Sequence, residues 1–153
     1  MCATGSNPAP TPPTPSTKSN REPAGCISDK INRGPPRLPL VAERHAHPLI
    51  AISRSHNTPE TFAHVEALRR RYPDAQVIEQ GSSYKFCLLA EGRVDYYVRT
   101  THTYEWDTAA GELILAEAGG RLEALADGAA FRYNKRDLQN PWFVCRAHNC
   151  AIG

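Results

Sequence analysis

From Pro48 onward, short apolar runs alternate with longer segments in which apolar residues recur every three or four positions. The short runs are typical of strands, and the periodic segments are typical of helices. Strands that alternate with helices predict an α/β layer structure rather than an all-α or all-β fold. We expect strands over Leu49–Ser53, Ala75–Glu79, Val94–Arg99, Leu122–Leu125 and Trp142–Cys145, and helices over residues 59–72, 84–91 and 107–118.

The ends of the first two helices carry recognisable signals. Thr58 is suited to cap a helix that has Pro59 at its first position, and Pro73 stops that helix. Gly92 follows the second helix, where a C-cap glycine is expected. These residues support the predicted helix boundaries.

The third helix is expected to begin at Asp107, after the strand that ends at Arg99. A carboxylate at the N-cap accepts hydrogen bonds from free N–H groups and lies at the positive end of the helix dipole, where metal and phosphate chemistry is favoured. An ordinary N-cap is the alternative interpretation of the same residue. The rest of this helix is almost wholly small or apolar, which predicts burial on all sides.

The first 40 residues differ sharply in composition from the rest. They hold nine of the 13 prolines, mixed with Ser, Thr, Asn and Gly. Few apolar side chains are available there to offset the entropy of ordering, so we expect a disordered tail with polyproline character. This tail is either passive or a Pro-rich docking motif. The predicted organisation is a tail over 1–40, an α/β unit over 41–147 and a short tail over 148–153.

The bulk composition excludes several classes of function. The 153 residues allow one domain with a core, and a net charge of +2 is too close to balance for nucleic acid or an anionic membrane as the main partner. No apolar run is long enough to span a bilayer, and the N-terminus lacks a secretory pattern, so we expect a cytoplasmic location. Five unevenly spaced cysteines indicate free thiols rather than a disulfide framework.

Two groups of side chains are possible metal ligands. His45 and His47 have no further ligand near them in sequence, and we interpret them as incidental. Cys145, His148 and Cys150 suit zinc or copper, and a frayed chain end is the alternative that we favour.

Polar groups gather where strands end and helices begin, which is where ligands bind in alternating sheets. The segment Gly81-Ser-Ser-Tyr-Lys85 offers backbone N–H groups, the hydroxyls of Ser82 and Ser83 and a cation, which suit a phosphate. Arg99 is placed to clamp an anion, and Asp107 to hold a hard cation such as Mg²⁺. In the alternative interpretation, Ser82 caps a helix, Lys85 is solvated and Arg99 pairs with an acid.

Several motifs resemble those of a known enzyme family. They are Gly81-Ser-Ser-Tyr-Lys-Phe-Cys87, Tyr97-Val-Arg99, Glu105-Trp-Asp-Thr-Ala-Ala-Gly111, and Arg132-Tyr-Asn-Lys135 with Asn140-Pro141. In this order and spacing they look like the C-terminal half of the 3'(2'),5'-bisphosphate nucleotidases, the CysQ-type branch of the inositol monophosphatase superfamily. The resemblance runs from about Leu49 to about Val144.

The resemblance implies a fold, an activity and roles for particular residues. It implies the C-terminal half of an inositol-monophosphatase-like layered α/β/α fold. Such relatives are Mg²⁺-dependent phosphatases that remove the 3'-phosphate of adenosine 3',5'-bisphosphate, a by-product of sulfur metabolism. By this resemblance Asp107 is a metal ligand, and Ser82, Lys85 and Arg99 contact the nucleotide or its phosphates.

One departure from the family pattern bears on activity. The family also uses an upstream acidic cluster and an Asp-Pro-x-Asp-Gly-Thr-type motif, and neither Asp127-Gly128 nor Asp29 resembles that motif. One carboxylate cannot hold two Mg²⁺ ions, since each needs several oxygens. We therefore expect the chain alone to be inactive or nearly so. We also expect exposed apolar area, which favours self-association or a separate N-terminal half as partner.

Three functions remain open at this stage. The chain is a truncated nucleotidase, a non-catalytic module that binds a nucleotide or a partner, or an interaction protein that acts through its Pro-rich tail.

Overall fold

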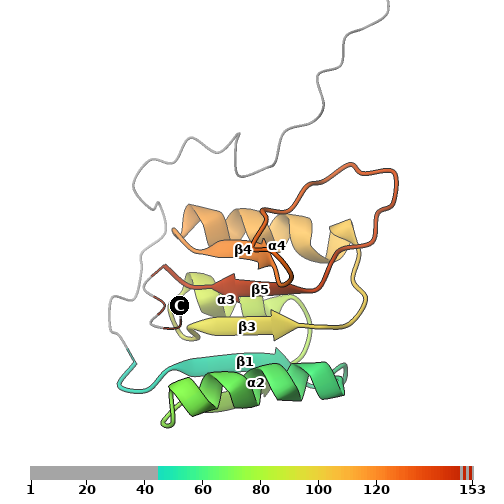
Figure 1. The fold of residues 1–153 in the computed structure, drawn as a ribbon. Helices are drawn as coiled ribbons and strands as arrows, with labels where there is room; N and C mark the ends of the chain where they lie inside the picture. Colours follow the sequence, from blue (N-terminus) through green and yellow to red (C-terminus); the bar gives the residue numbers. More distant parts are fainter. Residues whose placement is uncertain (1–44, 149, 151, 153) are drawn as a thin grey trace, which may run out of the picture.

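The described part of the chain is a five-stranded mixed sheet with three helices (Figure 1). The computed structural model describes residues 45–148, 150 and 152, so the expected tail over 1–40 lies outside the described residues. The strands are β1 (Leu49–Ser53), β2 (Gln76–Gln80), β3 (Tyr96–Arg99), β4 (Arg121–Ala124) and β5 (Phe143–Arg146). The helices are α2 (Pro59–Arg71), α3 (Tyr84–Ala90) and α4 (Glu105–Glu117).

The sheet has the strand order β2-β1-β3-β5-β4. Strands β2, β1 and β3 are parallel, while β5 is antiparallel to both β3 and β4. From β1 the chain leaves through α2 toward β2, whereas from β3 it leaves through α4 toward the opposite edge of the sheet. The carboxyl ends of β1 and β3 therefore form a topological switch point, where open α/β sheets bind ligands.

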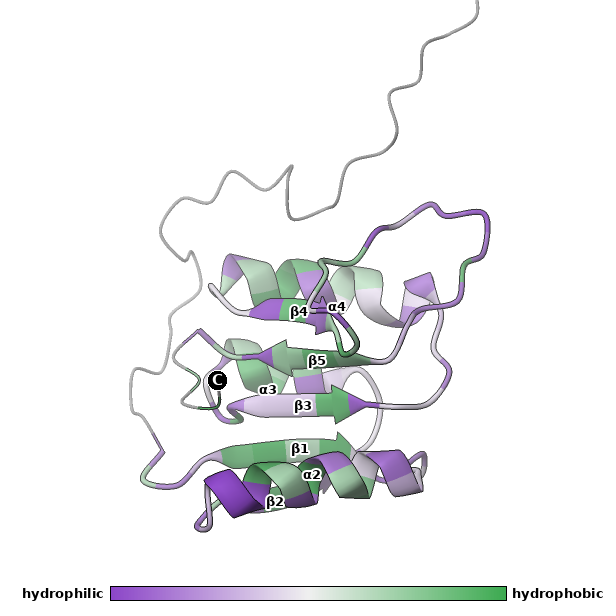
Figure 2. Ribbon diagram, viewed as in Figure 1, coloured by the Kyte–Doolittle hydropathy of each residue, from purple (hydrophilic) through white to green (hydrophobic). Residues whose placement is uncertain are grey.

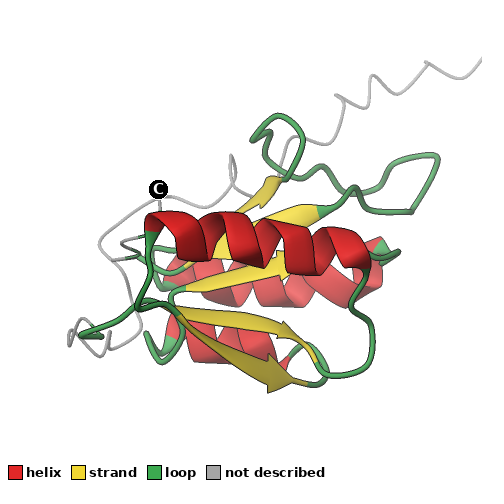
Figure 3. Ribbon diagram, turned by 60° about the horizontal axis from the view of Figure 1, so that its bottom comes forward, coloured by secondary structure: helices red, strands yellow, loops and turns green. Residues whose placement is uncertain are grey.

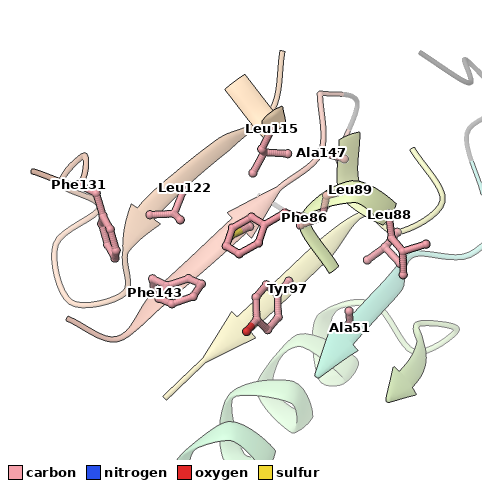
Figure 4. Packing of buried hydrophobic residues seen from close by; sticks show 12 residues of the cluster. Ala51, Phe86, Leu88, Leu89, Tyr97, Leu115, Leu122, Phe131, Phe143 and Ala147 are labelled. Atoms are coloured by element: carbon pink, nitrogen blue, oxygen red, sulfur yellow. The ribbon is translucent and has the colours of Figure 1, made fainter. Parts of the chain in front are cut away.

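The helices cover both faces of the sheet, with α2 on one face and α3 and α4 on the other (Figure 3). One buried cluster lies between the sheet and α2 and includes Ile50, Val65 and Tyr96. The other lies between the sheet and the α3–α4 pair, and Figure 4 shows Phe86 of α3 close to Tyr97 and Phe143. The expected α/β/α layering is confirmed.

Hydropathy follows these layers. Figure 2 shows β1 and much of β5 as hydrophobic, while α2 mixes hydrophilic and hydrophobic residues. Only Thr61 and Val65 of α2 are buried, which is the pattern of a helix with one face on a sheet. Thr58 caps α2 and Pro59 is its first residue, as the sequence predicts.

The start of α4 differs from the prediction by two residues. The helix begins at Glu105 rather than at Asp107, and Tyr104 is its N-cap, with an extended backbone at φ −121°. The Asp107 carboxylate accepts the N–H of Tyr104 at 2.8 Å. Asp107 therefore occupies the third helical position, and its carboxylate reaches back to the backbone N–H of the N-cap residue. Acidic residues commonly fill this position of a capping box.

The prediction that α4 is buried on all sides is wrong. Its inner face is buried at Thr108, Gly111, Glu112 and Leu115. Its outer face is exposed, and the side chains there are apolar: Trp106 is 66% exposed, Leu113 44% and Ile114 38%. The expected exposure of apolar area is thus located on one face of α4. Within the described residues, none of the helices has the length and apolar character that a membrane span requires.

Candidate functional site

A cavity of about 510 Å³ lies at the carboxyl ends of β1 and β3. The β2–α3 loop and the first turns of α4 complete its walls. This is the switch point of the sheet, the expected place for a ligand. The lining consists of Ser53, His56, Ser82, Ser83, Lys85, Phe86, Cys87, Tyr97, Arg99, Thr103, Trp106, Asp107, Thr108, Ala110, Gly111, Ile114 and Phe143.

All four residues that the sequence singled out line this one cavity: Ser82, Lys85, Arg99 and Asp107. They come from three separate segments, the β2–α3 connection, the end of β3 and the first turn of α4. The parallel direction of β2 and β3 brings the first two segments to the same edge of the sheet. The structure therefore places these residues together, and their roles toward a ligand remain predictions.

Lys85 is buried rather than solvated, with 2% of its surface exposed. Its ammonium donates hydrogen bonds to the carbonyls of Gln80 at 2.8 Å and Ser82 at 2.7 Å, and lies 4.8 Å from the ring centre of Tyr97. Burial, and then the charge of Arg99, lower its pKa to about 8. The alternative of a solvated Lys85 is therefore wrong, and Lys85 is one of the buried residues that line the cavity.

Ser82 does not cap α3, so that alternative is also wrong. The N-cap position belongs to Ser83, whose side chain makes no capping hydrogen bond. Ser82 has a left-handed backbone with φ +59°, which is uncommon outside glycine and often marks a functional site. Ser82 is an exposed residue of the cavity wall, and its carbonyl accepts a hydrogen bond from Lys85.

Arg99 adds a second cation at the end of β3. Among the residues that the structure describes, it forms no ion pair, and its buried Nε has no hydrogen-bond partner. The guanidinium of Arg54 lies against Gly81 in the β2–α3 loop. A Cβ atom added at Gly81 would be only 2.7 Å from Nη2 of Arg54. Asp107 is the single carboxylate in the lining, so the described cavity favours an anion.

Asp107 alone does not make a metal site. One carboxylate oxygen already accepts the N–H of Tyr104, and the other is on an exposed side chain. In the described ranges, no three His, Cys, Asp or Glu side chains come together as a metal site. Because Mg²⁺ takes six oxygens, the described residues do not fit a complete magnesium site.

The other possible metal ligands lie apart. The ring of His45 contacts the carbonyl of Gly92 at 2.9 Å, whereas His47 faces Asp74 at 3.9 Å. Cys145 is buried in β5, and burial raises the pKa of its thiol. His148 contacts the carbonyl of Gly119 instead.

The chain end does not fray at its described residues. Ile152 is buried in the cluster beneath α2, and Cys150 packs against that cluster.

Two further polar or aromatic residues line the cavity, although the sequence assigned them no role. His56 follows β1, and Trp106 is the second residue of α4. Trp106 belongs to the motif Glu105-Trp-Asp-Thr-Ala-Ala-Gly111, and His56 stands three residues after Ser53, the last residue of β1. Position after a strand was the available signal for His56.

A latch of hydrogen bonds holds the loop after β4 against the start of α4, and it also escaped prediction. The Glu105 carboxylate accepts the backbone N–H of Asn134 at 2.6 Å and of Lys135 at 3.1 Å, and the Lys135 ammonium at 2.6 Å. The Asn140 amide donates to the carbonyl of Tyr104 at 2.7 Å and to Thr108 at 3.1 Å. These contacts fix the first turn of α4, which carries Trp106 and Asp107.

The inner side of α4 packs closely on α3. A Cβ at Gly111 would lie 2.5 Å from the Phe86 ring, so glycine is required for this approach. Glu112 is buried one residue further on, and burial raises its pKa. The close packing sets the distance between the two helices that wall the cavity.

The chain is similar in sequence to known proteins. A family model described as the inositol monophosphatase family matches residues 28–151. An uncharacterized protein in the pss 5' region of Rhizobium leguminosarum bv. phaseoli is 51% identical over 70 residues, 42% of this chain and 73% of that protein. The 3'(2'),5'-bisphosphate nucleotidase CysQ of Buchnera aphidicola is 40% identical over 88 residues, 58% of this chain and 31% of that protein.

A solved structure shares the fold. The crystal structure of CysQ from Bacteroides thetaiotaomicron, a bacterial member of the inositol monophosphatase family, matches with a TM-score of 0.67 and 42% identity. The match covers 71% of this chain and 40% of that structure. The chain thus spans well under half the length of the CysQ relatives that it matches. Both the predicted resemblance and the predicted fold class are confirmed by these similarities.

Proposed function

Because the chain belongs to the inositol monophosphatase family, we propose that it carries the substrate-binding part of a 3'(2'),5'-bisphosphate nucleotidase. In this proposal the chain binds adenosine 3',5'-bisphosphate in the cavity at the switch point and releases little or no phosphate from it by itself. The observation that carries the proposal is the convergence of Ser82, Lys85, Arg99 and Asp107 on one cavity. The similarity to CysQ nucleotidases supports the choice of ligand.

The charges of the cavity suit a phosphorylated small molecule. Lys85 is held in place by two backbone carbonyls, and Arg99 presents a guanidinium that has no acidic partner in the described part of the chain. Guanidinium groups bind phosphate oxygens through paired N–H donors. Ser82 adds a hydroxyl that donates to an anion.

We propose that catalysis needs more acidic metal ligands than the described residues provide. In metal-dependent phosphoryl transfer, metal ions neutralise the charge of the transferred group and activate a water molecule. Asp107 is the one carboxylate that lines the cavity, so we propose that further acidic groups complete the Mg²⁺ site in an active assembly. A separate N-terminal half or a second copy of the chain is the proposed source. The exposed apolar side chains Trp106, Leu113 and Ile114 offer a surface for it.

Equilibrium binding tests the proposal directly. We expect adenosine 3',5'-bisphosphate to bind the full chain without added metal, and Arg99→Gln to weaken binding by about tenfold or more, because a charge-assisted hydrogen bond is worth about 1.5–3 kcal/mol. Arg69→Gln is the matched control, since Arg69 is exposed on α2, where it pairs with Glu66, and it does not line the cavity. Sedimentation of the same samples reports whether copies associate.

No binding by the unchanged chain, or equal weakening by the Arg99 and Arg69 substitutions, would contradict the proposal.

The proposed setting is the cytoplasm and sulfur metabolism, in which this nucleotide arises.

A further inference from the structure

Glu112 is a carboxyl group buried on the inner face of α4. It is 4% exposed, and its Oε2 atom has no hydrogen-bond partner among the residues that the structure describes. Within the same residues it forms no ion pair. An ionised carboxylate that lacks both a cation and a full set of hydrogen bonds is costly to bury. The surroundings of Glu112 therefore favour its neutral, protonated form.

The hydroxyl of Tyr133 lies beside Glu112 and has already used its single proton. Tyr133 belongs to the loop after β4, and its hydroxyl donates to Thr108 Oγ1 at 3.2 Å. The same hydroxyl interacts with the carboxyl of Glu112, one helical turn beyond Thr108. A phenol whose proton points to Thr108 offers Glu112 only lone pairs. A carboxylate cannot donate a hydrogen bond but a protonated carboxyl can, so these contacts also favour neutral Glu112.

Thr108 carries this contact to the first turn of α4. Its hydroxyl accepts hydrogen bonds from Tyr133 and from the Asn140 amide at 3.1 Å, and it donates to the carbonyl of Glu105 at 3.4 Å. Both lone pairs and the proton of this hydroxyl are thus in use. Thr108 also lines the cavity. A chain of hydrogen bonds therefore runs from Glu112 to the turn of α4 that walls the cavity.

The titratable groups around Glu112 do not supply a compensating charge. Tyr133 and, from β5, Cys145 interact with it, and burial raises the pKa of both groups, so both are uncharged near neutral pH. Lys85 of the neighbouring α3 interacts with Cys145. Burial raises the pKa of Glu112 as well, and the contact with Tyr133 offsets only part of this rise.

We infer that Glu112 is a neutral carboxylic acid in the folded chain, and that it is a positioning residue that holds Tyr133 and the first turn of α4 beside the cavity. Ionisation of Glu112 would draw the proton of Tyr133 away from Thr108 and so break the chain of hydrogen bonds. The protonation state of Glu112 is independent of the proposed function, whereas its effect on ligand binding rests on that proposal.

The pH dependence of stability tests the protonation state. A buried neutral acid keeps its proton at pH values where the unfolded chain has lost it, so a rise in pH favours unfolding. Between the ordinary value of 4.5 and the raised pKa of Glu112, the unfolding constant of the unchanged chain should rise relative to that of Glu112→Gln, by about tenfold for each pH unit. Urea denaturation measures both constants, and groups that titrate equally in both proteins cancel in the ratio. Glu66→Gln, on the exposed side of α2, is the control for which this ratio should stay constant.

Carbon-13 NMR of the side-chain carboxyl groups reports the same protonation in the unchanged chain, so this measurement does not depend on a variant that folds. The Glu112 signal should titrate at a higher pH than the signal of Glu105 on the same helix. Burial would raise the pKa of Glu105, but the hydrogen bonds that it accepts from Lys135 and Asn134 lower it.

Ligand binding separates a positioning role from the filling of buried space. Adenosine 3',5'-bisphosphate is titrated at about pH 6, where Lys85 is charged, into the unchanged chain, Glu112→Met and Glu112→Gln. Methionine fills a similar volume but has no donor for Tyr133, so Glu112→Met should bind about two- to tenfold more weakly. Glutamine restores a donor, so Glu112→Gln should recover the affinity that Glu112→Met loses.

Different outcomes overturn the separate claims. A Glu112 carboxyl that titrates at or below 4.5, or a ratio of unfolding constants that does not change from about pH 5 to about pH 8, overturns the neutral acid. Equal affinities of Glu112→Met and Glu112→Gln overturn the positioning role. If the unchanged chain binds no nucleotide, the proposed function fails and the positioning role fails with it, while the NMR titration still decides the protonation state.

Discussion

Lys85 brings a positive charge to a place that water hardly reaches. It is 2% exposed, and its ammonium is fixed by the carbonyls of Gln80 and Ser82. Burial disfavours the charged form, and the neighbouring Arg99 and Arg54 disfavour it further, so the pKa falls to about 8. A bound anion would offset this cost, which supports the proposed contact of Lys85 with a phosphate.

This pKa predicts a pH dependence of binding. Affinity for adenosine 3',5'-bisphosphate should fall as the pH rises through about 8, because Lys85 then loses its proton. The phosphate groups do not contribute to this change, since their second pKa is about 6. Titrations at several pH values on either side of 8 measure the effect. Lys85→Gln should bind more weakly and lose the dependence, and a variant that kept it would contradict the assignment.

Stability should move in the opposite direction over the same range. Lys85 has a folded-state pKa of about 8, below the value of about 10.4 expected in an unfolded chain. Between these values the unfolded chain binds more protons, so the free energy of unfolding contributed by Lys85 increases with pH.

At the scale of residues, the sequence predicted which residues lie at the site but not the local geometry of their side chains. Ser82, Lys85, Arg99 and Asp107 were singled out because they lie where strands end and helices begin, the usual place for ligands in an alternating sheet, and they line one cavity. The local geometry was not predictable. Whether Asp107 caps the helix or reaches back from its third position depends on which backbone N–H it accepts, and that is decided by packing.

At the scale of elements, the latch at the start of α4 joins two segments far apart in sequence. Glu105 holds the backbone and the ammonium of Lys135, 30 residues further along the chain. Burial alone would raise the pKa of Glu105, but the hydrogen bonds from Lys135 and Asn134 outweigh it, and the pKa is lowered. The latch therefore depends on an ionised carboxylate.

Loss of this carboxylate should destabilise the fold. Glu105→Gln is expected to reduce the free energy of unfolding by about 1–3 kcal/mol, because it removes the charge from three hydrogen bonds. Urea denaturation measures the change. Glu66→Gln is the control, since its exposed pair with Arg69 is worth no more than about 1 kcal/mol. Equal effects of the two substitutions would argue against the latch.

The elements themselves follow closely from the sequence. Every predicted strand appears, with ends within two residues of those expected, because alternation and turn residues are local signals. The latch could not be predicted, since the partners of Glu105 depend on the path of the loop after β4. The exposure of Leu113 and Ile114 was missed for the same reason, because an apolar helix reveals its buried face only once its neighbours are placed.

At the scale of the whole molecule, the described residues form a sheet covered on both faces, with one cavity at its switch point. Both faces of the sheet are covered by helices and hold buried clusters. The outer face of α4, beside the cavity, is apolar and exposed. The cavity is lined by two cations, Lys85 and Arg99, and by one carboxylate, Asp107. The cations suit binding of a phosphorylated ligand, whereas metal-dependent hydrolysis needs more carboxylates than this one.

The most direct measurement is phosphate release from adenosine 3',5'-bisphosphate by the purified full chain with Mg²⁺, beside Asp107→Ala. We predict that the chain binds the nucleotide and releases phosphate no faster than Asp107→Ala does, because one carboxylate does not organise the metal ions that the reaction needs. Turnover that disappears in Asp107→Ala would contradict this account, and would mean that other carboxylates of the chain complete the site.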